Sequence, residues 1–301
     1  MKFRRLIPAL TLGVLCFTGC DRKNNPLLSL PGSGVTTVSL FIPQIDTSGG
    51  SGTNRIFIYA TDDVGNPITT FSLGNFSILE GGNPGVPFEV GVVTEPLYLA
   101  LAIDRSGSMS LEGRTAAANS AAISIINSLG SNDFASIIEF ESVVTAPIGF
   151  TNDKSVLTTY VSTGQATNGG TALYDAILEC AGQLNGQKGR RLLLVLTDGD
   201  DTASASTISD AIAGVNGGGL SGNMVGLGSG INATFLQRIA QDTGGTYSFS
   251  SNGSDLSAAF AAILVRFENL VYVRYQRRSS GSIKAYLNYG AITASASKTF
   301  D

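Results

Sequence analysis

The stretch Ala102-Ile103-Asp104-Arg105-Ser106-Gly107-Ser108-Met109 decides the fold. An apolar run at 97–103 precedes it, and small residues with helical spacing follow it. This pattern predicts a buried strand that ends at Asp104 and continues into a loop. Alternate residues of an extended loop face the same way, so Asp104, Ser106 and Ser108 would direct one carboxylate and two hydroxyls to one point. Such oxygen ligands suit a divalent cation such as Mg²⁺.

Strand and helix patterns alternate through residues 95–270, and the aliphatic run 192–196 is typical of a strand covered on both faces. Strands are expected at 97–103, 134–140, 192–196, 223–227 and 246–250, and helices at 114–129, 154–161, 172–184, 208–215, 233–241 and 256–267. Repeated β-α units predict an α/β fold with a doubly wound, mainly parallel sheet. Ligands bind beyond the carboxyl ends of such strands, where Asp104 and Asp198 both stand.

Shorter strand patterns, separated by turns, flank this α/β unit. Residues 35–94 contain several, beginning at 35–42, and predict a small β-sandwich-like part. Residues 271–301 contain three more alternating patterns. Three strands alone are marginally stable. We therefore expect the C-terminal strands to complete the sandwich begun by residues 35–94, which makes the α/β unit an insertion in an all-β domain.

The N-terminus has the pattern of a targeting segment. A basic start and a short apolar stretch lead to Phe17-Thr18-Gly19-Cys20, which resembles the lipobox of bacterial lipoproteins. This resemblance implies a signal peptide at 1–19, lipidation of Cys20, and attachment to a membrane on the extracytoplasmic side of the bacterial envelope. Residues 20–34 are rich in Asn, Pro, Ser and Gly, which predicts a flexible tether. The alternative is an ordinary secretory signal in which Cys20 has no special role.

Composition excludes several function classes. The chain has no histidine, which rules out Ser-His-Asp and Cys-His catalysis and any His-ligated zinc site. The net charge of −4 argues against non-specific nucleic-acid binding, which depends on Lys and Arg contacts to phosphate. Cys180 is the one cysteine outside the N-terminal segment, and it falls on an apolar helical stripe. We expect it to be a buried core thiol.

Two further stretches accompany the opening loop. Thr167-Asn168-Gly169-Gly170-Thr171-Ala172-Leu173 precedes a helix, and Leu196-Thr197-Asp198-Gly199-Asp200-Asp201 ends an aliphatic strand. Together with Asp-x-Ser-x-Ser they resemble the von Willebrand factor A domain and its metal-ion-dependent adhesion site, over residues 95–268. The resemblance implies that Asp104, Ser106, Ser108, Thr171 and Asp198 hold a divalent cation. Mg²⁺ is the first expectation, and Mn²⁺ and Ca²⁺ are the alternatives.

In that family the two serines and the threonine bind the cation directly or through water, and the aspartates act through water or orient hydroxyls. A partner protein's Asp or Glu carboxylate commonly fills the open position. Asp104 and Asp198 could instead be ordinary turn residues. However, two carboxylates about 4 Å apart repel by roughly 4 kcal/mol at an effective dielectric constant of 20, and a cation relieves this repulsion. We expect Asp175, Asp200 and Asp201 to lie outside the ligand set.

These features predict a non-enzymatic, envelope-anchored lipoprotein that binds a partner protein through its metal site, in adhesion or assembly. One alternative is a structural envelope protein whose metal only stabilises loops. Another is a metal-assisted hydrolase that uses Asp104 and Asp198, for which the sequence offers no histidine base.

Overall fold

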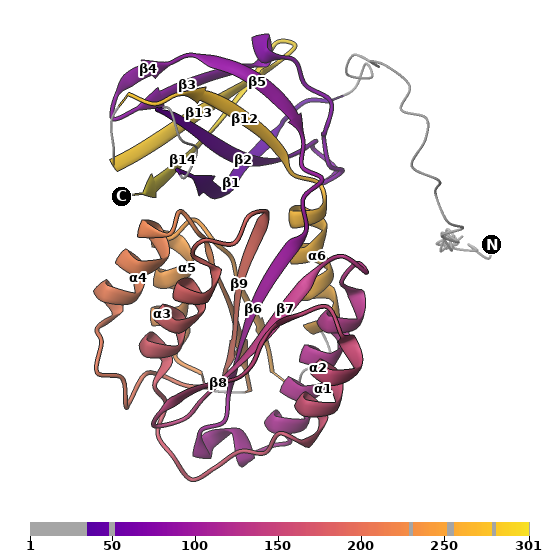
Figure 1. Cartoon of the computed structure of the whole chain (residues 1–301), viewed down its shortest axis with the longest axis vertical. Coiled ribbons are helices and arrows are strands. Elements are labelled where there is room, and N and C mark those ends of the chain that lie inside the picture. Colours follow the sequence, from indigo (N-terminus) through magenta and orange to yellow (C-terminus); the bar gives the residue numbers. More distant parts are fainter. Residues whose placement is uncertain (1–34, 48–51, 229–230, 252–255, 279–280, 301) are drawn as a thin grey trace, which may run out of the picture.

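The structure is a computed structural model that describes residues 35–47, 52–228, 231–251, 256–278 and 281–300. It has two units, a β-sandwich and an α/β unit, stacked end to end (Figure 1). The predicted signal peptide, the tether and Cys20 lie outside the described residues. Within the described part of the chain, no helix is long and apolar enough to cross a membrane.

The α/β unit is built on a six-stranded sheet with the order β11-β10-β9-β6-β7-β8. Its strands are β6 (Leu97–Asp104), β7 (Phe134–Phe140), β8 (Val144–Thr151), β9 (Arg190–Thr197), β10 (Gly222–Leu227) and β11 (Tyr247–Ser250). All neighbouring pairs are parallel except β7 and β8. The predicted doubly wound, mainly parallel sheet is therefore confirmed.

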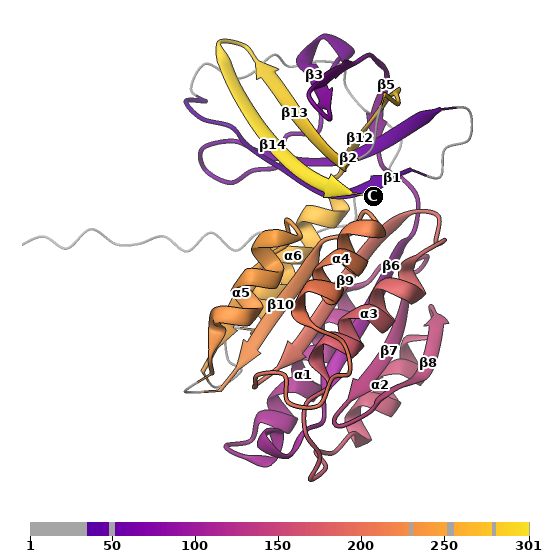
Figure 2. The ribbon, with the colours of Figure 1, turned by 90° about the vertical axis from the view of Figure 1, so that its left-hand side faces the viewer.

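Helices cover both faces of this sheet, as Figure 2 shows from one side. One face packs against α1 (Arg114–Ser128), α2 (Lys154–Thr163) and α6 (Leu256–Glu268), and the other against α3 (Leu173–Leu184), α4 (Ile208–Gly217) and α5 (Ala233–Asp242). Successive strand residues point to opposite faces, so Leu101 of β6 joins the first core and Ala102 the second. Cys180 is buried in the second core, as predicted.

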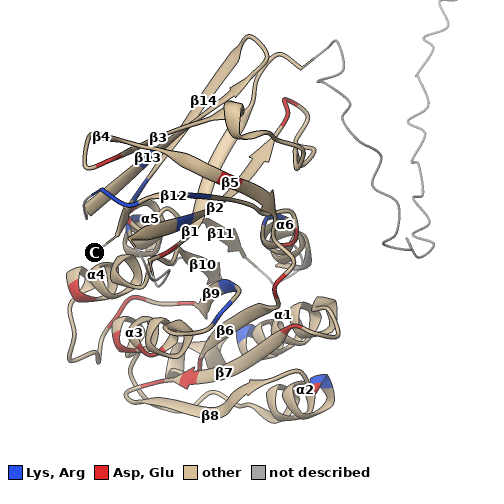
Figure 3. Cartoon of the chain, turned by 45° about the horizontal axis from the view of Figure 1, so that its top comes forward, with Lys and Arg blue, Asp and Glu red and all other residues tan. Residues whose placement is uncertain are grey.

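The β-sandwich contains strands from both ends of the chain (Figure 3). One sheet has the order β1-β2-β12-β5 and the other β14-β13-β3-β4. The bounds are β1 (Ser39–Asp46), β2 (Thr53–Thr61), β3 (Phe76–Glu80), β4 (Asn83–Gly85), β5 (Pro87–Val92), β12 (Val271–Gln276), β13 (Gly281–Tyr289) and β14 (Ile292–Phe300), with the short 3₁₀ helix η1 (Leu73–Asn75) before β3. Because β12 pairs with β2 and β5, and β13 pairs with β3, the α/β unit interrupts a single sandwich.

The first strand lies later than its apolar pattern indicates. The run at 35–42 predicts a strand, but β1 begins at Ser39 and extends to Asp46. Its register against β2 shifts between Phe41 and Gln44, which accommodates Pro43 in an edge strand. The apolar pattern stops before Pro43, so the predicted strand ends there. The bulge that lets β1 continue past Pro43 cannot be seen in the sequence.

Polar contacts join the two units at one end of the α/β sheet. The Gln44 side chain accepts a hydrogen bond from the Arg191 N–H (2.8 Å) and donates one to the Gly189 carbonyl (2.9 Å). The Ile45 N–H donates to the Gly219 carbonyl (2.8 Å). Buried Lys298 of β14 donates to the carbonyls of Leu220 and Thr243 (2.5 and 2.8 Å). This junction fixes the sandwich opposite the carboxyl ends of the parallel strands.

Candidate metal centre

The candidate site lies at the carboxyl edge of the sheet, where β6 and β9 end side by side. These strands are parallel neighbours, and Ile103 is in register with Leu196. Asp104 and Thr197 are therefore the last residues of adjacent strands, and Asp198 follows immediately. The register of the sheet thus brings together two carboxylates that are far apart in sequence.

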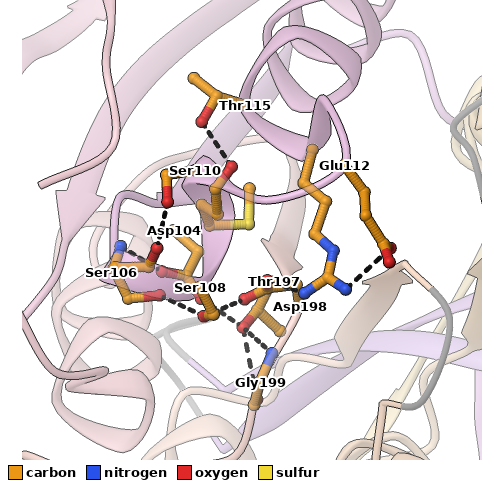
Figure 4. A network of polar contacts seen from close by, with 12 residues as sticks. Asp104, Ser106, Ser108, Ser110, Glu112, Thr115, Thr197, Asp198 and Gly199 are labelled. Atoms are coloured by element: carbon orange, nitrogen blue, oxygen red, sulfur yellow. Dashed lines mark hydrogen bonds and ion pairs between the residues drawn. The ribbon is translucent and has the colours of Figure 1, made fainter. Parts of the chain in front are cut away.

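Asp104 has a fully buried side chain with fixed donors on both oxygens (Figure 4). Its Oδ1 accepts a hydrogen bond from the Ser106 N–H at 2.7 Å, and its Oδ2 accepts one from the Thr197 hydroxyl at 2.6 Å. Burial raises the pKa of Asp104 to about 6, and the nearby charge of Asp198 adds to this shift, while the hydrogen bonds from Ser106 and Thr197 oppose it. A cation beside this carboxylate would stabilise its charged form.

The two serines and Asp198 continue the cluster. Ser106 Oγ lies 3.1 Å from Ser108 Oγ, and the Ser108 hydroxyl donates to Asp198 Oδ1 at 2.7 Å. Ser106 directly precedes the short 3₁₀ helix η2 (Gly107–Ser110), and Ser108 lies within it. Four of the five predicted site residues are thus joined by one continuous set of polar contacts, which Figure 4 shows.

Thr171 reaches the same place from the loop before α3. A methyl group added at Gly199 would lie 3.8 Å from Ser108 Oγ and 3.9 Å from Thr171 Oγ1. Gly199 therefore lies close to both hydroxyls. The loop is held against η2 because the Gly107 N–H donates to the Gly169 carbonyl at 3.0 Å. The structure thus brings all five predicted residues together.

The residues present fit a small, hard divalent cation. No three Asp, Glu, Cys or His side chains gather at one point in the described ranges, so hydroxyl oxygens must supply much of any ligand set. Ser106, Ser108 and Thr171 supply them beside the carboxylates of Asp104 and Asp198. Oxygen donors of this kind suit Mg²⁺.

Three further acidic residues, Asp175, Asp200 and Asp201, form hydrogen bonds in and around the loop after β9. The Asp175 carboxylate accepts hydrogen bonds from the N–H groups of Ala205 (2.8 Å) and Ser206 (3.0 Å). Asp201 accepts one from the Ser204 hydroxyl, and Asp200 accepts one from the Asn232 side chain (3.2 Å). None of these hydrogen bonds reaches the five-residue cluster, so these residues shape the loop around it.

Two residues that contact the cluster, Thr197 and Arg114, were not predicted from the sequence. The resemblance assigns no role to Thr197, although the structure shows that its hydroxyl orients Asp104. Arg114, expected merely to begin a helix, donates from Nη1 to Asp198 Oδ2 at 2.6 Å and from Nη2 to Glu112 Oε2 at 3.0 Å. The position of Thr197 at a strand end could have indicated its role. No spacing rule indicates the contact of Arg114.

A groove of about 530 Å³ lies directly beside η2. It runs between α1 and the segment that follows α2, and Met109 and Ser110 of η2 form part of its wall. Its lining carries no charged side chain: Met109, Ser110, Gly113, Thr115, Ala116, Asn119, Ser120, Ile123, Ser162, Gln165 and Ala166. A groove lined by uncharged residues therefore lies next to the cluster.

Comparisons with known proteins agree with this architecture. Residues 97–249 match the family model of the von Willebrand factor type A domain. No curated protein matches the chain. Among solved structures, a von Willebrand factor type A protein from Catenulispora acidiphila superposes with a TM-score of 0.53 at 13% identity, covering 89% of this chain and 74% of that one.

Two other solved structures share the fold. The conserved hypothetical protein BatB from Bacteroides thetaiotaomicron has a TM-score of 0.50 and 21% identity, covering 56% of this chain and 97% of that chain. Proximal thread matrix protein 1 from the mussel byssus, whose structure has a zinc-occupied MIDAS motif, has a TM-score of 0.52 and 14% identity, covering 64% of this chain and 50% of that one. Since the family match spans half of the sequence, this chain belongs to the von Willebrand factor type A domain family.

Proposed function

We propose that this protein is a non-enzymatic, envelope-anchored lipoprotein that binds a partner protein through a divalent cation. The cation would be held at a metal-ion-dependent adhesion site made of Asp104, Ser106, Ser108, Thr171 and Asp198. The observation that carries the proposal is the convergence of these side chains at one sheet edge, with Ser108 donating to Asp198 at 2.7 Å. The zinc-occupied motif of the mussel protein supports a divalent cation, and the oxygen ligands favour Mg²⁺ in this chain.

In this proposal the ion supplies a positive charge at the surface that attracts a carboxylate of the partner. The hydroxyls of Ser106, Ser108 and Thr171 contribute oxygen ligands. Asp104 and Asp198 neutralise the ion and hold these hydroxyls and its water molecules in place. The neutral groove beside η2 gives the partner a contact surface next to its carboxylate.

Binding fits the site better than hydrolysis does. A metal-assisted hydrolase would need a free general base beside the ion, and the chain has no histidine to act as one. The Asp104 carboxylate accepts hydrogen bonds on both oxygens, and Asp198 is committed to Ser108 and Arg114. These carboxylates are therefore engaged in holding the cluster together.

Cys20 would carry the lipid that anchors the chain to a membrane on the extracytoplasmic side. Each buried methylene of an acyl chain contributes about 0.8 kcal/mol, so two or three chains hold a protein firmly. The residues between Cys20 and β1 would then set the distance between the membrane and the sandwich.

The test is capture of a partner from bacterial envelope extract by the immobilised full-length protein, with Mg²⁺ or with EDTA. We expect one partner to be retained with Mg²⁺ and released by EDTA, and to be lost with Asp104→Ala. Asp242→Ala, an exposed carboxylate on α5, is the matched control and should capture normally. If the partner is retained equally well in EDTA and by the Asp104→Ala protein, the proposed function is refuted.

A further inference from the structure

Arg114 places a permanent positive charge inside the metal centre. Its Nη1 donates to Asp198 Oδ2 at 2.6 Å. The other oxygen of the Asp198 carboxylate accepts a hydrogen bond from Ser108 (Figure 4). The Asp198 side chain is fully buried and that of Arg114 is 13% exposed, whereas Glu112, the second partner of Arg114, is 58% exposed. Since solvent screens the exposed partner far more than the buried one, the charge of Arg114 acts mainly on the cluster.

The local backbone is shaped to bring Arg114 there. Glu112 has φ 52°, the one positive value at a non-glycine residue in the described part of the chain, and Gly113 follows with φ 72°. These two left-handed residues turn the chain from η2 into α1, so that Arg114, the first residue of the helix, lies next to Asp198. At Gly228, a Cβ would stand 2.4 Å from Arg114 Nε, so a larger residue there would displace the arginine.

Formal charges show what this arginine changes. Asp104 and Asp198 carry two negative charges, which a divalent cation alone would neutralise. With Arg114 included, the metal-loaded centre has one positive charge left over. A single carboxylate from a partner then brings the centre to neutrality, which is favoured because Asp104 and Asp198 are shielded from water.

We propose that Arg114 is a specificity-determining residue of the metal centre, a built-in cation that weakens metal binding and makes the loaded site attract one carboxylate. This inference rests on the proposed function, and it adds that Arg114 sets how strongly the site binds the metal and the carboxylate. Metal and carboxylate should therefore bind cooperatively, each raising the affinity for the other by the same factor. A chain without this charge should bind the metal more tightly and gain less from the carboxylate.

The test is titration of the full-length protein with Mg²⁺ by calorimetry, with and without acetate as the carboxylate probe. In the wild-type protein, acetate should raise the Mg²⁺ affinity. In Arg114→Gln, the affinity without acetate should rise about tenfold, and the effect of acetate should shrink. Arg114→Lys keeps the charge and should resemble wild type. Arg238→Gln removes an exposed arginine of an ion pair on α5 and is the matched control.

If Arg114 had only a structural role, its replacement would not raise the Mg²⁺ affinity and at the same time reduce the effect of acetate. If Arg114→Gln binds Mg²⁺ no more tightly than wild type, or keeps the full acetate effect, the inference is wrong although the metal site stands. If neither protein binds Mg²⁺, the proposed function fails with it. Should Arg114→Gln fail to fold, Arg114→Met decides. This variant keeps an unbranched side chain without the charge, so it should bind Mg²⁺ more tightly than wild type and respond less to acetate, and no change would overturn the inference.

Discussion

The Thr197 hydroxyl donates a 2.6 Å hydrogen bond to Asp104 Oδ2, and these two residues end the adjacent parallel strands β9 and β6. The contact follows from the strand register, because Ile103 and Leu196 are paired one residue earlier. Asp104 is therefore oriented by the sheet itself and does not require an ion for its position.

Replacing Thr197 with valine should weaken metal binding. The substitution keeps the shape of this buried side chain but removes the donor that orients Asp104. Residues that orient metal ligands typically change affinity by 10- to 100-fold, so we expect a loss of at least about tenfold in Mg²⁺ affinity. Calorimetry measures it, with Thr293→Val, at an exposed position of β14, as the control. An unchanged affinity would mean that the hydrogen bond does not position the carboxylate.

The stability of the metal-free protein should depend on the ionisation of Asp104. Burial raises its pKa from 3.8 to about 6, so between these pH values the folded chain holds a proton that the unfolded chain has lost. The free energy of unfolding should therefore fall as pH rises through this window, by about 3 kcal/mol if the shift is fully expressed.

Urea unfolding in EDTA, from pH 4 to pH 7, measures this effect. Asp104→Asn cannot ionise and is the reference, so the stability difference between the two proteins should change in favour of the variant as pH rises. A difference that is constant over the range would show that Asp104 has an ordinary pKa.

The junction between the units should be sensitive to Gln44. Its side chain satisfies both the Arg191 N–H and the Gly189 carbonyl. Gln44→Ala leaves these two backbone groups without their partner, which should cost about 2 kcal/mol of unfolding free energy. Chemical denaturation gives the value, and Gln237→Ala, exposed on α5, should cost little. Equal effects of the two substitutions would argue against a role of the junction in stability.

Cys20→Ser should release the protein from the membrane. The proposed lipid attaches to the cysteine sulfur, and a serine at this position cannot accept it. Fractionation of cells that express each form would follow the change, with Cys16→Ser as the control inside the apolar stretch. If the Cys20→Ser protein stays in the membrane fraction at the wild-type level, the lipoprotein proposal fails.

Local patterns predicted the strands of the sheet and placed Asp104 and Asp198 at strand ends, whereas the full five-residue set, with Thr171, came from the resemblance to the von Willebrand factor A domain. Continuous aliphatic runs identify parallel strands, and the residues that follow them must lie at one edge. Arg114 could not be placed this way, because its position depends on two left-handed residues, Glu112 and Gly113, and on the space left by Gly228. The shift of β1 past Pro43 similarly depends on its pairing with β2.

Titration of the metal-free protein with Mg²⁺ tests the metal site most directly. Calorimetry should show one ion bound per chain in the wild-type protein, and no binding when Ser106 and Ser108 are both replaced by alanine. The double variant should still fold, since its strands and helix cores are untouched. Absence of Mg²⁺ binding by the wild-type protein, or equal binding by the double variant, would contradict the assignment of a metal site to Asp104, Ser106, Ser108, Thr171 and Asp198.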